Sequence, residues 1–132
     1  NCCFEIHCQE SDFRILSLHS ATYQGDLKRV TQSYLNAIAK YHEQIDLIGH
    51  PFYTKTCEFL EVESFVDCLN QYGIPLEIDT AYLRKERTDL NKLKYALEHL
   101  ETGVYVNSDM HTFGDWEQRK AGFELLGKRG FL

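Results

Sequence analysis

Short apolar runs that alternate with longer amphipathic segments constrain the fold of this 132-residue chain more than any other feature. Five runs have the length and the β-branched or aromatic content of β-strands, at residues 2–6, 13–18, 45–48, 74–78 and 104–106. The segments between most of them carry apolar residues at helical spacing. This alternation predicts an α/β fold in which parallel strands are joined by helical crossovers.

The amphipathic segments predict helices at residues 27–41, 62–72, 90–100 and 115–128. Gly73 and Gly103 follow the second and third of these segments, where a glycine commonly ends a helix. In the last segment we expect Trp116 and Phe123 to pack in the core. Because the chain has no internal repeat and no linker, we expect residues 1–132 to belong to a single domain.

The composition excludes several classes of protein. A hydrophobic content of 43% is typical of a folded globular domain, and no apolar run approaches the length of a membrane span. The net charge of −6, without a basic patch, argues against a long nucleic-acid partner. The cysteine count is odd and no Cys-x-x-Cys occurs, so we expect buried, reduced thiols and a cytoplasmic protein, with metal ligation by Cys8 as the alternative.

Residues of metal-ligand type follow the apolar runs at several places. They are Glu5, His7, His19, His50, Asp109 and His111. The carboxyl ends of parallel strands meet at one end of an α/β barrel, so these side chains are expected to converge. A lone histidine at a strand end is more often structural, but three such strand ends favour a metal site. Mixed imidazole and carboxylate ligands suit Zn, Mn or Fe.

Four motifs resemble, in the same order, later motifs of the PHP (polymerase and histidinol phosphatase) superfamily. They are Phe4-Glu5-Ile6, Leu16-Ser17-Leu18-His19, Asp46-Leu47-Ile48-Gly49-His50-Pro51 and Asn107-Ser108-Asp109-Met110-His111. Residues 74–85 are similar to a segment of its histidinol-phosphatase-like members. The resemblance implies a distorted (β/α)7 barrel with two or three divalent metal ions at the strand ends. The first strands and the opening His-x-His motif of the family have no counterpart here, so we expect the C-terminal portion of that domain, an N-terminally incomplete barrel.

The resemblance also implies roles for individual residues. Glu5 matches a bridging carboxylate, and the terminal metal ligands would be His19, His50, Asp109 and His111. Arg84 would clamp a substrate phosphate through its guanidinium group, although a solvated arginine is an equally good interpretation. His7, which matches no ligand of the family, and Asp79, where the family usually has asparagine, are further candidates for substrate contact.

The function expected from these residues is a metal-dependent phosphoesterase, in which a metal-bound hydroxide attacks the phosphorus of a small phosphate monoester. With about half of the family's ligands absent, we expect the chain alone to be inactive or weakly active. Two alternatives remain open. One is a phosphoesterase of the same fold that acts on a nucleotide or a nucleic-acid end, and the other is a catalytically inactive metal-binding or regulatory module. An incomplete barrel would also leave an open strand edge that favours self-association.

Overall fold

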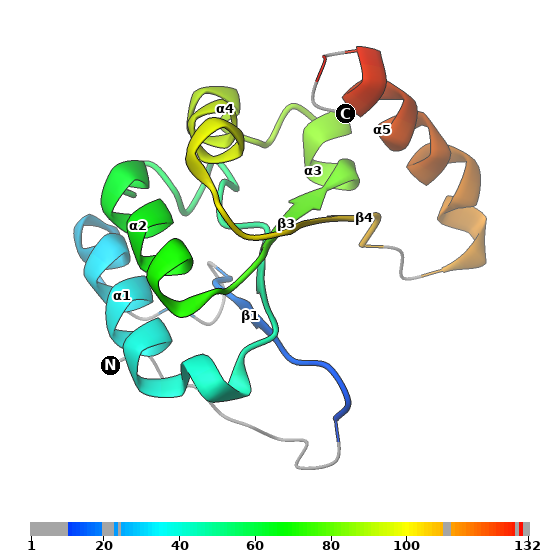
Figure 1. Ribbon diagram of the computed structural model, residues 1–132. Coiled ribbons are helices and arrows are strands. Elements are labelled where there is room, and N and C mark those ends of the chain that lie inside the picture. Colours follow the sequence, from blue (N-terminus) through cyan, green and yellow to red (C-terminus); the bar gives the residue numbers. More distant parts are fainter. Residues whose placement is uncertain (1–10, 20–22, 24, 110–111, 129, 131–132) are drawn as a thin grey trace.

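A four-stranded parallel sheet is the centre of the computed structural model, which describes residues 11–19, 23, 25–109, 112–128 and 130. The strands are β1 (Ile15–Ser17), β2 (Leu47–Gly49), β3 (Leu76–Asp79) and β4 (Val104–Asn107), and they pair in the order β1-β2-β3-β4 (Figure 1). The predicted α/β class and parallel pairing are therefore confirmed. The strand expected at residues 2–6 lies outside the described residues.

The helices occupy the segments that the apolar periodicity predicts. They are α1 (Val30–Tyr41), α2 (Val62–Tyr72), α4 (Leu90–His99) and α5 (Trp116–Lys128). One further helix, α3 (Thr80–Arg84), follows β3 directly and was not predicted. Helices α1, α2 and α4 pack side by side, whereas α5 lies at the other end of the sheet beside α3 (Figure 1). Within the described ranges, no helix combines the length and apolarity that crossing a membrane requires.

The core lies between the sheet and the α1, α2 and α4 helices. Alternate strand residues enter it, since successive side chains of a strand point to opposite faces. The core side chains of the strands are Ile48, Leu76 and Ile78, and those of the helices include Ile38, Phe65, Leu69 and Leu93. The Phe65 ring packs with its centroid 5.1 Å from that of Tyr34 and 6.2 Å from that of Phe52. Cys57 and Cys68 are buried free thiols, as predicted, and burial raises the pKa of Cys57 to about 11.

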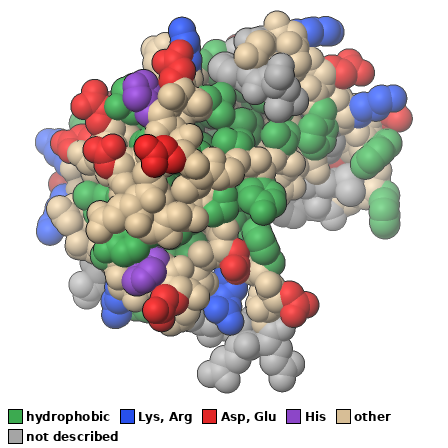
Figure 2. All heavy atoms as spheres, in the orientation of Figure 1, with side chains coloured by type: hydrophobic (Ala, Val, Ile, Leu, Met, Phe, Trp, Pro, Cys, Tyr) green, Lys and Arg blue, Asp and Glu red, His purple; other side chains and the backbone are tan. Residues whose placement is uncertain are grey.

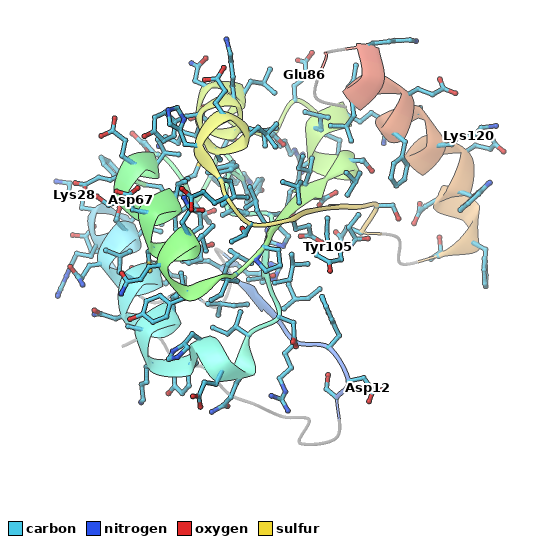
Figure 3. All side chains as sticks on the ribbon, viewed as in Figure 1. Asp12, Lys28, Asp67, Glu86, Tyr105 and Lys120 are labelled. Atoms are coloured by element: carbon cyan, nitrogen blue, oxygen red, sulfur yellow. The ribbon has the colours of Figure 1, made fainter. Side chains whose placement is uncertain are left out.

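The opposite face of the sheet carries side chains from both ends of the strand order. Phe13, two residues before β1, has its ring centroid 6.1 Å from that of Tyr105 on β4. Tyr105 is 51% exposed and lies on the side of β4 away from α4 (Figure 3). An aromatic contact between Phe13, next to β1, and Tyr105 of β4 therefore spans this face.

Two glycines were expected to end helices, and only one does. Gly73 caps α2 in the left-handed conformation at φ 68°, and its N–H reaches the carbonyl oxygens of Leu69 and Asn70. The prediction for Gly103 is wrong, because α4 ends at His99 and Leu100 already has an extended backbone. Thr102 instead donates its hydroxyl to the Ile74 carbonyl at 2.9 Å, so this connection is held by a side chain.

Helix α5 contradicts the expectation for its aromatic residues. Trp116 is 61% exposed and Phe123 is 41% exposed, so neither packs in the core. Hydrophobic side chains protrude at the edge of the molecule that α5 forms (Figure 2). The physical reason is that α5 packs mainly against the short helix α3, and among the α5 residues whose burial is described Gly122 and Leu126 are the buried ones.

Candidate metal site

Four of the predicted site residues follow or end the four strands. His19 lies two residues beyond β1, His50 directly follows β2, and Asp109 lies two residues beyond β4. Asp79 is the last residue of β3. Because the strands are parallel and adjacent, all four residues lie at the same edge of the sheet, where open α/β sheets bind their ligands.

The two histidines are in contact. Their ring centroids are 5.0 Å apart in an edge-to-face arrangement, and the His50 ring is also 5.2 Å from that of Tyr82. The Nδ1 atom of His50 is buried and has no hydrogen-bond partner within the described residues. Desolvation, followed by the neighbouring His50, lowers the pKa of His19 below 6.5, and Asp109 opposes this shift. His19 is therefore held towards the neutral imidazole form, which is the form that binds metals.

Two of the predicted ligands have unusual backbone conformations. His50 has φ 30° and Asp109 has φ 45°, both in the left-handed region that side chains other than glycine seldom occupy. Such conformations cost about 1–3 kcal/mol each and persist only where the surrounding structure holds them. Glu86, at φ 54°, is the third non-glycine residue of this kind among the described residues.

Hydrogen bonds to Glu77 help to stabilise the left-handed conformations of His50 and Asp109. Glu77 lies on the face of β3 opposite to the core residues Leu76 and Ile78 and is only 5% exposed. Its Oε2 accepts the backbone N–H of His50 at 2.8 Å, and its Oε1 accepts an Nδ2–H of Asn107 at 2.7 Å. The Oδ1 of Asn107 in turn accepts the N–H groups of Ser108 at 2.7 Å and of Asp109 at 3.4 Å. Both segments that carry predicted ligands are thus bonded to one carboxylate.

Asp79 has one occupied and one unoccupied carboxylate oxygen. Its Oδ1 accepts the N–H groups of Ala81 at 2.7 Å and Tyr82 at 3.4 Å, which caps the first turn of α3. Its Oδ2 is buried and has no hydrogen-bond partner within the described residues, and the side chain as a whole is 4% exposed. Burial raises the pKa of Asp79, and Asp109 and Glu77 add to the shift, while the bond from Ala81 opposes it.

A small pocket lies between His50 and Asp79. Its walls include Phe52, Tyr53, Tyr82 and Leu93. The rings of Tyr53 and Tyr82 are stacked with centroids 4.5 Å apart, so this wall is formed by two aromatic side chains in contact. The pocket therefore offers an aromatic wall with an unsatisfied carboxylate oxygen at one side.

Arg84 is the last residue of α3 and is half-buried, but it does not line this pocket. Charged side chains elsewhere, such as those of Lys28, Asp67, Glu86 and Lys120, point away from the body of the molecule (Figure 3). On the face shown in Figure 2, basic side chains are scattered among acidic ones.

The remaining predicted residues, Glu5, His7 and His111, lie outside the described residues. In the part of the chain that the structure describes, no three His, Cys, Asp or Glu side chains form a group that could hold a metal. What it brings together is the His19–His50 pair, with Asp109 close enough to affect the pKa of His19. Paired imidazoles and a buried unbonded Nδ1 atom are chemically suited to a divalent transition metal.

Sequence reasoning missed three residues at this edge. Glu77 was not among the predicted site residues, although a carboxylate inside the apolar run 74–78 is a signal for a buried, bonded charge. Asn107 and Tyr82 gave no signal of their own, because their roles depend on contacts with Glu77 and His50 across the sheet.

A scan of protein-family models and searches of curated proteins and of solved structures found no match to this chain.

Proposed function

We propose that this chain belongs to a metal-dependent phosphoesterase that hydrolyses a small phosphate monoester. The observation that carries the proposal is the pairing of His19 and His50 at 5.0 Å at the edge where the strands end. Asp109 completes the described part of the site from β4, and Glu5 and His111 would add to it. A bound divalent metal lowers the pKa of water and neutralises phosphate charge, which is the chemistry that this hydrolysis requires.

The parallel sheet supports the fold part of the same proposal. Parallel strands that pair in chain order and are joined by helices are also the arrangement of a β/α barrel wall. We infer an incomplete (β/α)7 barrel of the PHP type, most similar to histidinol-phosphatase-like members. The metal would be Zn, Mn or Fe, because the donors are imidazoles and carboxylates.

In this proposal the substrate contacts fall into two groups. The pocket beside Asp79 has a volume of about 10 Å³, room for about one water, so the leaving group would lie at its mouth and direct a hydroxyl or N–H to the unbonded Oδ2 of Asp79. Arg84 from α3 and His7 would contact the phosphate.

Metal binding by the 132-residue chain is the first test. Titration calorimetry with Zn²⁺ and Mn²⁺ would compare the wild type with H19A, H50A and the control H99A, whose histidine ends α4 far from this edge. We expect H19A and H50A to weaken binding at least about tenfold and H99A to leave it unchanged, since loss of even an outer-shell partner costs about 10–100-fold. Equal affinity in all four proteins would contradict the proposal.

Activity is the second test, on the chain and on any longer protein that contains it. The substrates would be p-nitrophenyl phosphate, histidinol phosphate, nucleoside monophosphates and a short single-stranded oligonucleotide. The proposal expects metal-dependent turnover of a small monoester. Preference for a nucleotide or oligonucleotide would favour the nucleic-acid alternative, and tight metal binding without turnover of any substrate would favour an inactive metal-binding module.

A further inference from the structure

The exits of β2 and β4, which carry His50 and Asp109, are separated by β3. Their relative position is therefore set through β3. The residue of β3 that reaches both exits is Glu77, whose two oxygens bond to the His50 backbone N–H and to the Asn107 side chain. Gly49 makes this reach possible, because a Cβ there would lie 3.2 Å from Glu77 Oε2 and 2.2 Å from Ser17 Oγ.

These bonds have a fixed direction. Both oxygens of the Glu77 carboxylate act as acceptors, whereas Asn107 must donate from Nδ2 to Glu77 and accept at Oδ1 from Ser108 and Asp109. A carboxamide at position 77 has only one acceptor oxygen. It could keep the bond from His50 or the bond from Asn107, but not both.

The bonds end at the two strained positions of the site. His50, at φ 30°, donates directly to Glu77, and Asp109, at φ 45°, is reached through Asn107. Left-handed backbone at a residue other than glycine persists only where its surroundings impose it. A buried carboxylate that bonds to both segments is such a constraint.

We propose that Glu77 is a positioning residue whose single carboxylate fixes His50 and Asp109 relative to each other and thereby sets the metal affinity of the site. This inference rests on the proposed function, because it takes both residues as metal ligands. It assigns Glu77 no contact with metal or substrate. Its effect passes through the backbone of β2 and through Asn107.

The test is an exchange of the two side-chain chemistries. In E77Q the new amide N–H faces the Asn107 Nδ2–H, so a donor faces a donor. In N107D the new carboxylate faces the Glu77 carboxylate, so an acceptor faces an acceptor. The double variant E77Q/N107D restores every bond, because the new amide donates to the new carboxylate and still accepts from His50. All substitutions keep the size of the side chain. E98Q on the exposed surface of α4, where Glu98 pairs with Lys94 at 3.8 Å, is the matched control.

Two readouts are needed, and the first does not involve metal. In the metal-free chain, amide hydrogen exchange at His50, Ser108 and Asp109 should accelerate at least about tenfold in E77Q or N107D and return close to wild type in the double variant. Calorimetric Zn²⁺ affinity should fall about 10–100-fold in each single variant and recover in the double variant. E98Q should change neither readout.

Each outcome decides the proposal. Exchange and affinity in E77Q equal to those in E98Q would overturn it. Failure of the double variant to recover either readout would also overturn it, since both substitutions would then act only by weakening the sheet. If E77Q does not fold, N107D alone decides by the same criteria, because Asn107 is exposed. If the wild type binds no Zn²⁺, the proposed function fails, whereas recovery of exchange in the double variant still supports the positioning of both segments by Glu77.

Discussion

The close contact between α5 and α3 leads to a prediction that the structure makes quantitative. At Gly122 on α5, an added Cβ would lie 2.7 Å from Thr80 Cβ and 2.9 Å from the Thr80 backbone oxygen. The Thr80 carbonyl belongs to the first turn of α3 and cannot rotate away, so G122A must displace one helix from the other. Overpacking of this kind costs about 1–3 kcal/mol.

Gly127 on the same helix is the matched control, because nothing lies within 4 Å of a Cβ added there. Both substitutions gain up to about 1 kcal/mol from the higher helix propensity of alanine. The difference in unfolding free energy between G127A and G122A therefore isolates the contact. We expect G127A to be the more stable by about 1–3 kcal/mol. In melting temperature this is about 3–5 °C for each kcal/mol in a chain of this length.

The assay is urea unfolding followed both by circular dichroism and by the fluorescence of Trp116, the only tryptophan, at the start of α5. In G122A the fluorescence transition should come at lower urea than the dichroism transition, because α5 packs mainly on α3 and can separate first. If G122A and G127A unfold within about 0.5 kcal/mol of each other, near the limit of such comparisons, the reasoning from the Thr80 contact is refuted.

Three further predictions concern the site and the core. The folded state holds the pKa of His19 below 6.5, so the unfolded chain binds this proton at a higher pH than the folded chain does. The melting temperature in EDTA should therefore fall as the pH drops below about 6.5. The H19Q variant should flatten that part of the profile of melting temperature against pH. Burial raises the pKa of Asp79 and makes its charged form costly at neutral pH, so D79N should be more stable than wild type at pH 7 by about 0.5–2 kcal/mol. The same variant should lose affinity for any substrate that donates a hydrogen bond to Oδ2 of Asp79. An unchanged melting temperature and an unchanged KM would both count against our interpretation of Asp79. F65A should lower the unfolding free energy by about 3–5 kcal/mol, because Phe65 is fully buried between Tyr34 and Phe52, and a loss below about 1 kcal/mol in urea titrations would contradict the described core.

The parts of the fold that apolar periodicity controls were predictable from the sequence. The helices α1, α2 and α4 and the four described strands occur where the pattern placed them. Each helix buries one apolar face, whereas β2 and β3 are buried on both faces and appear in the sequence as short apolar runs. Helix α3 was not predicted, since five residues carry no period of their own and the helix depends on capping by Asp79. The error for Trp116 and Phe123 has a related cause. Helical spacing shows that a face is apolar, but it does not show whether anything covers that face.

The candidate site divides in the same way. Placing His19, His50 and Asp109 at strand ends needed only the order of the elements, and the structure confirms that His19 and His50 come together. The metal-ligand role of these residues stays a prediction, as do the roles of Glu5, His7 and His111. The role of Glu77 could not be predicted, because it depends on a register in which Glu77 lies opposite Tyr105 while its carboxylate reaches both neighbouring strands.

The strands pair in the order in which they occur along the chain, and this has a consequence for biosynthesis. A ribosome releases β1 first and β4 last, so every new strand meets a neighbour that has already been made. The exit of β2 gains the Glu77 bond only after β3 has emerged, and Asn107 arrives with β4 to take the second oxygen. The nascent chain therefore cannot assemble the His50–Glu77–Asn107 arrangement before β4 has emerged, and a cation that requires His50 and Asp109 together would find them in place only after residue 109 has been synthesised.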